Sequence, residues 1–227
     1  MKQGEEVELV KDRPALTRER ILEAAVAVAD RGGLSAVSMR NVGREAGVEA
    51  MSLYHHVRNK GDLLDALADW IFAEVIVPGR HDPWREAMEV RAGSLRSVLT
   101  AHPWALTLVE ARRSPGPTIL GDHEAVLACL RTSGLSVPLA AHAFAAIDSY
   151  VYGFALTEQN LPIEEGERTD EFVEEIGVPL EQYPFLAEYL AVMVVGQDFA
   201  FADEFGYGLA LILDQLELQH ARETSAH

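Results

Sequence analysis

The chain contains a single cysteine, Cys129, among its 227 residues. One cysteine excludes an intramolecular disulfide framework and a four-cysteine zinc site. A chain so poor in cysteine suits a reducing compartment, so we expect a cytoplasmic protein.

Long apolar runs are also missing. Residues 1–14 carry four acidic side chains and no apolar stretch, which argues against a signal peptide. The longest weakly charged stretch, Pro138 to Thr157, is interrupted by His142 and Asp148 and is rich in alanine. We therefore interpret this stretch as a buried helix and expect no membrane partner.

The motifs of common enzymes are incomplete. His123-Glu124 begins like the zinc-protease motif H-E-x-x-H, but the second histidine position holds Leu127. A Gly-x-Gly sequence at 206–208 begins like a dinucleotide fingerprint, yet the third glycine and a preceding strand are missing. The chain contains no G-x-S-x-G. We expect no catalysis, no metal and no cofactor.

Charge is distributed unevenly along the chain, whose formal net charge is −17. Residues 13–60 hold eight basic and five acidic residues, whereas residues 61–227 hold nine basic and 27 acidic residues. The mildly basic charge of residues 13–60, followed by a strongly acidic remainder, suggests that the N-terminal part alone binds nucleic acid. A chance distribution is the alternative interpretation.

The apolar spacing predicts an all-α fold, with an N-terminal three-helix helix-turn-helix domain at 13–60 and a larger helical domain at 61–227. The acidic segment between 160 and 184 is expected to be a mobile loop. The predicted helices cover about 17–31, 39–46, 49–57, 59–77, 83–101, 103–112, 118–133, 138–159, 184–195 and 198–220. Thr17, Ser38 and Asn59 are the predicted N-caps of the first, second and fourth of these helices.

Residues 38–60 have the pattern of a helix-turn-helix. Gly47 lies between two short helical segments, where a tight turn requires a residue that tolerates the left-handed conformation. Val42, Leu53 and Val57 are spaced to pack the two helices together, and small Gly43 allows a close approach. The second segment, 49–57, is therefore the predicted DNA-reading helix.

Residues 17–75 resemble the DNA-binding domain of the tetracycline-repressor (TetR) family. The resemblance depends on the turn residue Gly47, the Leu53-Tyr54 pair and Lys60 at the start of the next helix. The string GVEAMSLYHHVRNKGDLLDAL and the final helix, FADEFGYGLALILDQLE, are similar to the tetracycline-repressor branch itself. The family implies a homodimeric regulator, in its usual mode a repressor, that binds a palindromic operator in double-stranded DNA and responds to a small-molecule effector.

The resemblance implies that Ala50, Met51 and Ser52 face base edges in the major groove. Tyr54, His56 and Lys60 are expected to contact phosphates, and Thr17, Ser38 and Arg40 are further candidates. Tyr54 could instead be a packing residue, and His55 and His56 could be ordinary surface residues. The full predicted DNA-binding set is Thr17, Ser38, Arg40, Ala50, Met51, Ser52, Tyr54, His55, His56 and Lys60.

The helices after the first four would form an effector cavity in this family, with the helix at 59–77 connecting it to the DNA-binding domain. Arg91 or His102 could orient an anionic or hydroxyl group of the effector, although most of the candidate residues are core residues by default. The predicted ligand contacts are Phe72, Trp84, Met88, Arg91, Leu95, His102, Trp104, Leu108, Tyr150 and Phe154.

Two features refine this prediction. Arg91 and Val109 occupy positions where the tetracycline-binding branch has an asparagine and a metal-binding histidine, so we expect a hydrophobic or aromatic effector without a metal.

The apolar faces at 138–159 and 198–220 predict a two-fold dimer, unless both line the core of one chain. The alternative function is a helical regulator or scaffold that responds to a protein partner without a small-molecule effector.

Overall fold

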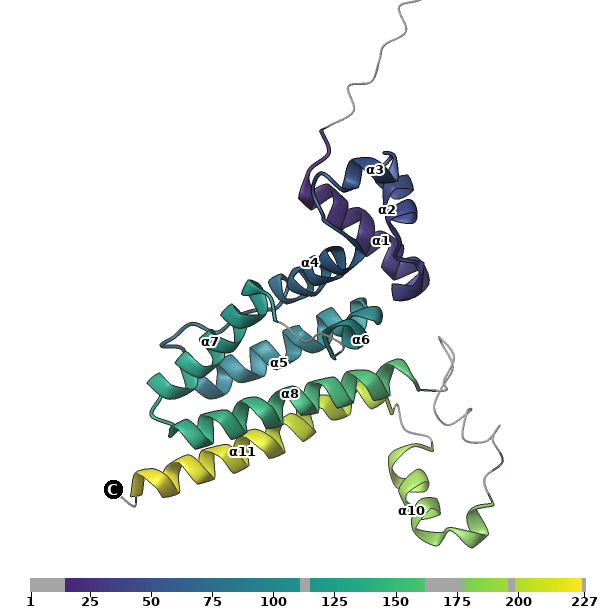
Figure 1. The fold of residues 1–227 in the computed structure, drawn as a ribbon. Coiled ribbons are helices and arrows are strands. Elements are labelled where there is room, and N and C mark those ends of the chain that lie inside the picture. The colour runs from purple at the N-terminus through teal and green to yellow at the C-terminus, as the bar shows by residue number, and fades with distance from the viewer. Residues whose placement is uncertain (1–14, 111–114, 162–176, 178, 196–198, 226–227) are drawn as a thin grey trace, which may run out of the picture. The chain divides into compact units, whose positions relative to one another are not determined.

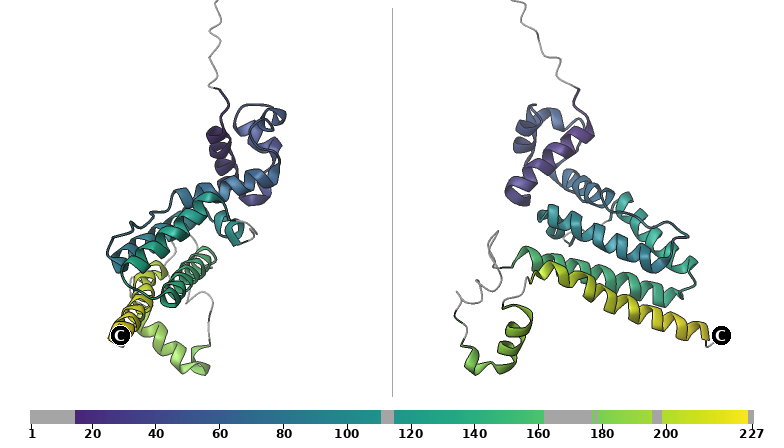
Figure 2. Two further views of the ribbon diagram at one scale, coloured as in Figure 1. Left: turned by 60° about the vertical axis from the view of Figure 1, so that its left-hand side comes forward. Right: turned by 180° about the vertical axis from the view of Figure 1, so that it is seen from behind.

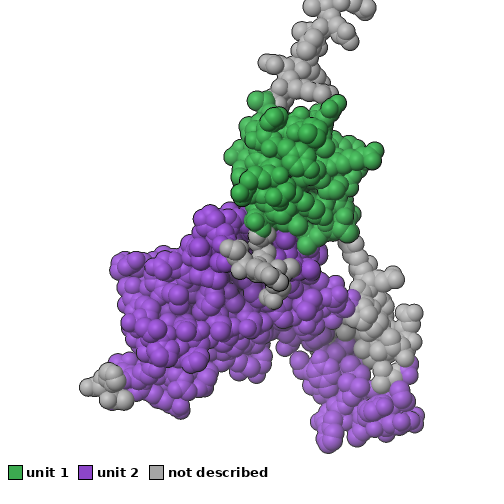
Figure 3. Space-filling model, in the orientation of Figure 1, with its two compact units in different colours: residues 1–67 green, residues 68–227 purple. Residues whose placement is uncertain are grey.

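The structure is a computed structural model that describes residues 15–110, 115–161, 177, 179–195 and 199–225. The described residues form helices joined by turns, without a strand, which confirms the all-α prediction. The chain divides into two compact units between Leu67 and Ala68 (Figure 3). This division lies within the connecting helix, after the predicted domain boundary at residue 60.

The first unit contains α1 (Arg18–Ala36), α2 (Met39–Glu45) and α3 (Ala50–Leu53) (Figure 1). The Thr17 side chain accepts a hydrogen bond from the backbone N–H of Arg20, and Ser38 does the same for Asn41, so both predicted N-caps are confirmed. Non-helical backbone angles at Gly32 and Gly33 interrupt α1, where the sequence predicted its end.

The turn between α2 and α3 depends on two glycines. Gly47 has a φ of 72°, in the left-handed region that favours glycine. A Cβ at Gly43 would lie 3.0 Å from the carbonyl oxygen of Val48 and 3.1 Å from the backbone nitrogen of Ala50. The close approach of the two helices therefore favours glycine at position 43, since a side chain there would force the neighbouring backbone to shift.

Helix α4 (Lys60–Ala73) continues from the first unit into the second. Asn59 accepts a hydrogen bond from the backbone N–H of Asp62 at 3.0 Å, so the predicted cap is confirmed. Leu63, Leu67 and Ile71 are fully buried along one face of this helix. The helix ends at Ala73, earlier than the predicted residue 77.

The second unit is built around α8 (Val137–Gln159), which contacts α5 (Trp84–Ala101), α7 (Pro117–Thr132) and α11 (Glu204–Ser225). Helices α8 and α11 run side by side in every view (Figures 1 and 2). The remaining elements are α6 (Trp104–Glu110), α10 (Pro184–Met193) and two short 3₁₀ helices, Leu180–Gln182 and Phe201–Asp203.

The packing of α8 on α11 depends on Tyr150. Its hydroxyl donates a hydrogen bond to the carbonyl oxygen of Phe205 at 2.9 Å, and its ring stacks on the Phe205 ring with centroids 5.4 Å apart. A Cβ at Gly208 would collide with the Tyr150 ring, so glycine at this position lets the two helices approach. Phe154 extends the same aromatic cluster.

Two sequence predictions concern helix length. The predicted reading helix, 49–57, is wrong in extent, because α3 ends at Leu53 and is followed by a turn. The final helix begins at Glu204 and extends to Ser225, whereas the predicted range was 198–220. Most of the acidic segment that was expected to be mobile, residues 162–176 and 178, lies outside the described residues.

Helix α8 is long and apolar enough to cross a membrane by length and composition alone, a test that the core helix of a soluble protein also passes. Eight residues of α8 are buried in the interior of the second unit, and Asp148 is one of them. An ion-paired carboxylate on the buried face is consistent with the interpretation of α8 as a core helix.

Candidate DNA-reading helix and effector cavity

Helix α3 combines one anchoring side chain with an exposed outer face. Leu53 is fully buried and fixes the helix to its unit. Met51 is 71% exposed and Tyr54 is 45% exposed, while Ala50 and Ser52 are half-buried beside them. Short and flexible side chains on a small exposed helix can approach the edges of bases in a major groove.

The residues after α3 form a turn instead of a continued helix. The backbone N–H groups of His55 and His56 donate to the carbonyl oxygens of Ser52 and Leu53, and that of Val57 donates to Leu53. Val57 is buried, which leaves His55 exposed and His56 half-buried on the way to α4. Tyr54, His55 and His56 therefore project from a turn, where the sequence had predicted helix.

Exposed cations lie on both sides of α3 in the sequence. The side chains of Arg40 and Lys60 are exposed and form no ion pair within the described part of the chain. Arg31 pairs with Glu45, and Arg58 pairs with Asp62 at 3.3 Å. Arg40 and Lys60 thus have charge available for phosphate, although DNA contact by the predicted set stays a prediction.

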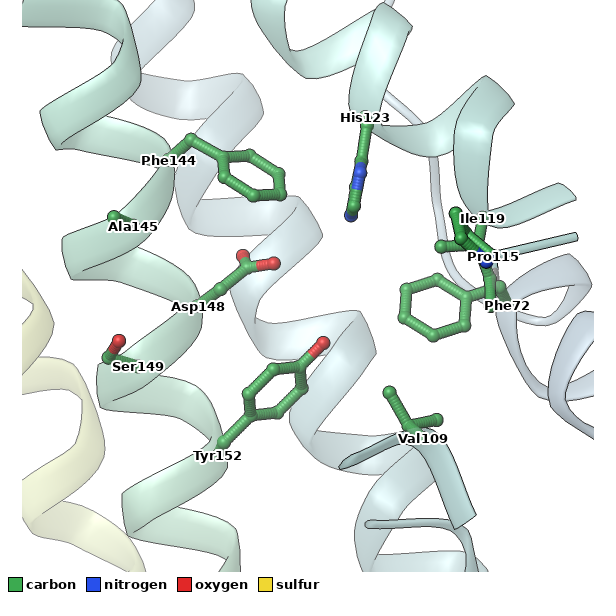
Figure 4. Close-up of a pocket in the computed structure, with 10 residues that line it drawn as sticks. All are labelled: Phe72, Val109, Pro115, Ile119, His123, Phe144, Ala145, Asp148, Ser149 and Tyr152. Atoms are coloured by element: carbon green, nitrogen blue, oxygen red, sulfur yellow. The ribbon is translucent and has the colours of Figure 1, made fainter. Parts of the chain in front are cut away.

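A cavity of about 450 Å³ lies within the second unit (Figure 4). Helices α4, α6, α7 and α8 contribute to its wall, and most of the lining is apolar or aromatic. The residues that line it are Phe72, Val109, Pro115, Ile119, His123, Phe144, Ala145, Asp148, Ser149 and Tyr152. The volume lies in the range of small-molecule sites in proteins.

A buried ion-pair cluster borders this cavity. The guanidinium of Arg91 donates to Asp122 from Nε at 2.9 Å and from Nη2 at 2.5 Å. It also donates to Asp148, from Nη1 at 2.6 Å and from Nη2 at 3.3 Å. Arg91 and Asp122 are each 1% exposed and Asp148 is 6% exposed. The cluster therefore ties α5 to α7 and α8 in the interior.

The electrostatics of the cluster favour an ionised arginine. Burial by itself would lower the pKa of Arg91, but the hydrogen bonds and charges of Asp122 and Asp148 outweigh burial and raise it. Two carboxylates against one guanidinium leave one net negative charge. Arg91 is not among the described residues that line the cavity, and its expected role in orienting an anionic or hydroxyl group stays a prediction, which this net negative charge disfavours for an anion.

Of the predicted ligand contacts, the cavity includes Phe72 among its lining residues. Met88, Leu95 and Leu108 are buried core residues, as is Trp104, and Trp84 is half-buried at the start of α5. The His102 ring lies between the rings of Trp70 and Trp104, with centroids 5.4 and 5.7 Å away. Tyr150 and Phe154 belong to the α8–α11 aromatic cluster. Ligand contact by these residues stays a prediction.

Sequence reasoning did not select four of the lining residues that carry aromatic or ionisable groups. Phe144, Asp148 and Tyr152 follow one another at intervals of four along α8, and His123 faces them from α7 (Figure 4). The ring of His123 meets the Phe144 ring edge-on, with centroids 4.6 Å apart. Asp148 was the residue through which the sequence could have indicated this site, because a carboxylate within an apolar helix requires a hydrogen-bonding or charged partner.

These features define a helix-turn-helix protein with a separate helical unit that contains a cavity of small-molecule size. Residues 21–67 match "Bacterial regulatory proteins, tetR family", and residues 77–220 match "Tetracyclin repressor-like, C-terminal domain". The chain belongs to the TetR family of helix-turn-helix transcriptional regulators, as the sequence resemblance had indicated.

Among its relatives, the "HTH-type transcriptional repressor DrrR1" of Streptomyces coeruleorubidus is 37% identical over 219 residues, which cover 91% of this chain and 79% of the relative. The "Tetracycline repressor protein class A from transposon 1721" of Escherichia coli is 32% identical over 200 residues, covering 86% of this chain and 88% of that protein. Both are transcriptional repressors by name, and the family is not one of known enzymes.

Solved structures show the same fold. Apo ActR from Streptomyces coelicolor superposes with a TM-score of 0.74 at 27% identity, covering 92% of this chain and 98% of ActR. ActR in complex with actinorhodin gives a TM-score of 0.71 at 27% identity, with 91% and 99% covered. Regulators of this family thus bind DNA and small-molecule effectors.

Proposed function

We propose that this protein is a homodimeric repressor that binds a palindromic operator through α3 and leaves it when a small hydrophobic or aromatic molecule fills the cavity of the second unit. The observation that carries the proposal is the course of α4. This helix begins at Lys60, directly after the helix-turn-helix, and contributes Phe72 to the cavity wall.

DNA reading is assigned to the exposed face of α3. Met51 and Ala50 cannot donate paired hydrogen bonds to a base, so they suit contacts with thymine methyl groups. Ser52 can exchange one hydrogen bond with a base edge. Arg40 and Lys60 would bind phosphates, with the caps Thr17 and Ser38 and the turn residues Tyr54, His55 and His56 beside them.

The dimer is assigned to the exposed sides of α8 and α11. Tyr207, Leu211 and Leu218 follow one another at helical spacing on α11 and are 68%, 57% and 54% exposed. Leu156 on α8 is 53% exposed. A second copy that covered these side chains would bury apolar surface and supply the second reading helix that a palindromic operator requires.

Release requires that the effector bind better to the state in which the two reading helices do not fit the operator. A 100-fold preference for that state corresponds to about 2.7 kcal/mol of coupling. Actinorhodin is bound to ActR in a solved complex, which supports a small-molecule effector for this protein. A scaffold without an effector is the second candidate, and the presence of a cavity of small-molecule size disfavours it.

Selection of duplexes from a random DNA library by the purified protein tests this function. The proposal predicts enrichment of an inverted repeat whose half-sites lie about one helical turn apart. Loss of enrichment in a Met51→Ala, Ser52→Ala variant would assign the reading to α3. A library that stays random after several rounds of selection with the wild-type protein would contradict the proposal.

The dimer is tested separately by sedimentation. Leu211→Glu places a charge on the proposed interface and should yield a monomer. Val90→Glu on α5 is the matched control, because Val90 is 52% exposed and lies on another helix. Equal behaviour of both variants would contradict the assignment of the interface.

A further inference from the structure

The charge of the cavity is set by α8. Asp148 is the carboxylate among the described lining residues, and neither lysine nor arginine lines the cavity in the described part of the chain. His123 and Tyr152 are the other titratable groups that line it. The cluster behind Asp148 contains two carboxylates and one guanidinium, so the wall carries a net negative charge.

The Asp148 carboxylate has acceptor capacity beyond its bonds to Arg91. Its oxygens accept two hydrogen bonds from Arg91, a short one of 2.6 Å and a long one of 3.3 Å. An ionised carboxylate offers about four acceptor sites in all. Figure 4 shows the carboxylate directed from α8 toward the space between α7 and α8. A donor inside the cavity can therefore bind Asp148 without displacing Arg91.

The aromatic lining favours a cation as well. Phe72, Phe144 and Tyr152 surround the carboxylate with ring surfaces (Figure 4). The negative face of an aromatic ring attracts an ammonium group, more strongly where water is excluded. The Arg91 guanidinium already lies 5.8 Å from the centroid of the Phe144 ring, so this ring accommodates positive charge.

We infer that the effector is an amphipathic organic cation whose protonated amine binds the Asp148 carboxylate, while its apolar body packs against the surrounding rings. The inference rests on the proposed function and narrows it, since it names the chemical class that the cavity selects. An anionic ligand of the same shape would be disfavoured, because it would face the net negative charge of the cluster at short range.

Three naphthalene probes of similar size and different charge test this inference. They are 1-naphthaleneethylamine, which is a cation at neutral pH, 1-naphthaleneethanol, which is neutral, and 3-(1-naphthyl)propionate, which is an anion. Binding is measured by isothermal titration calorimetry near pH 8, where the amine of the first probe stays protonated. The cation should bind about tenfold or more tightly than the other two probes.

Two substitutions locate the selectivity. Asp148→Asn removes the charge that lines the cavity and keeps a similar shape, so it should reduce cation affinity about tenfold and leave the alcohol unchanged. Asp122→Asn is the matched control, because Asp122 pairs with the same arginine but does not line the cavity. Both substitutions make the cluster formally neutral, but Asp122→Asn keeps the carboxylate that lines the cavity, so it should retain tighter binding of the cation than of the alcohol. Thermal melting of both variants verifies that each remains folded.

The outcomes separate this inference from the proposed function. A preference for the cation that Asp148→Asn abolishes and Asp122→Asn keeps supports the inference, whether or not the probe releases DNA. Equal affinity for all three probes, tighter binding of the anion, or no binding of the cation at millimolar concentration overturns it. Release of selected DNA by all three probes alike would uphold the proposed function while the inference fails.

Discussion

Replacement of Arg91 by leucine tests the buried cluster directly. The substitution removes four hydrogen bonds and leaves two carboxylates, 1% and 6% exposed, without their cation. Breaking a buried pair in this way typically costs about 3–5 kcal/mol, because an uncompensated charge remains in the interior. We expect Arg91→Leu to lower the free energy of unfolding by that amount.

Arg85 on the same helix provides the matched control. It pairs with Asp214 at 2.6 Å and Glu217 at 3.1 Å, distances similar to those of Arg91, but its side chain is 30% exposed and its partners are more than 60% exposed. Water screens such pairs, so Arg85→Leu should cost less than about 1 kcal/mol. Comparing the two variants therefore separates the effect of burial on stability from the effect of hydrogen-bond distance.

The assay is urea unfolding followed by circular dichroism at a fixed protein concentration, since dimerisation would make stability depend on concentration. Replacing all three residues by apolar ones of similar size should recover most of the loss. Equal costs for Arg91→Leu and Arg85→Leu would refute the reasoning.

Three further predictions concern DNA affinity, helix packing and pH. Lys60→Ala should weaken binding to matched and shuffled duplexes alike and lower the salt dependence by about one ion per protomer, measured by fluorescence anisotropy. Gly208→Ala should cost about 1–3 kcal/mol by collision with Tyr150, whereas Gly206→Ala, which has open space, should be neutral or stabilising in urea unfolding. The backbone N–H of Arg58 lowers the pKa of Asp62, so its contribution is present above about pH 4 and is lost as the pH falls through the folded pKa. Asp62→Asn should therefore destabilise the protein at neutral pH, with the difference narrowing at acidic pH.

Local chemistry made the first unit predictable. Thr17, Ser38 and Asn59 are residue types that cap helices, and Gly47 is the type that a left-handed turn requires. Each was assigned from the sequence and was found in that role. The length of α3 was missed, because the residues at 54–56 continue a helical pattern while their backbone forms a turn.

The cavity was less predictable, because it depends on how distant helices meet. Buried residues of α5 such as Met88 and Leu95 have the same apolar pattern whether they face a ligand or the core. The contact of Arg91 with Asp122 and Asp148 joins residues that are 31 and 57 positions apart. No local pattern encodes such a pairing, so the sequence could mark Asp148 as unusual but could not supply its partner.

The central claim, that α3 reads an operator, is tested most directly by fluorescence anisotropy of the wild-type protein with the selected duplex and a shuffled version of it, at two salt concentrations. The account predicts a preference for the selected duplex of about a thousandfold, with both affinities falling as salt rises. Affinities within a few-fold of each other at both salt concentrations would contradict it.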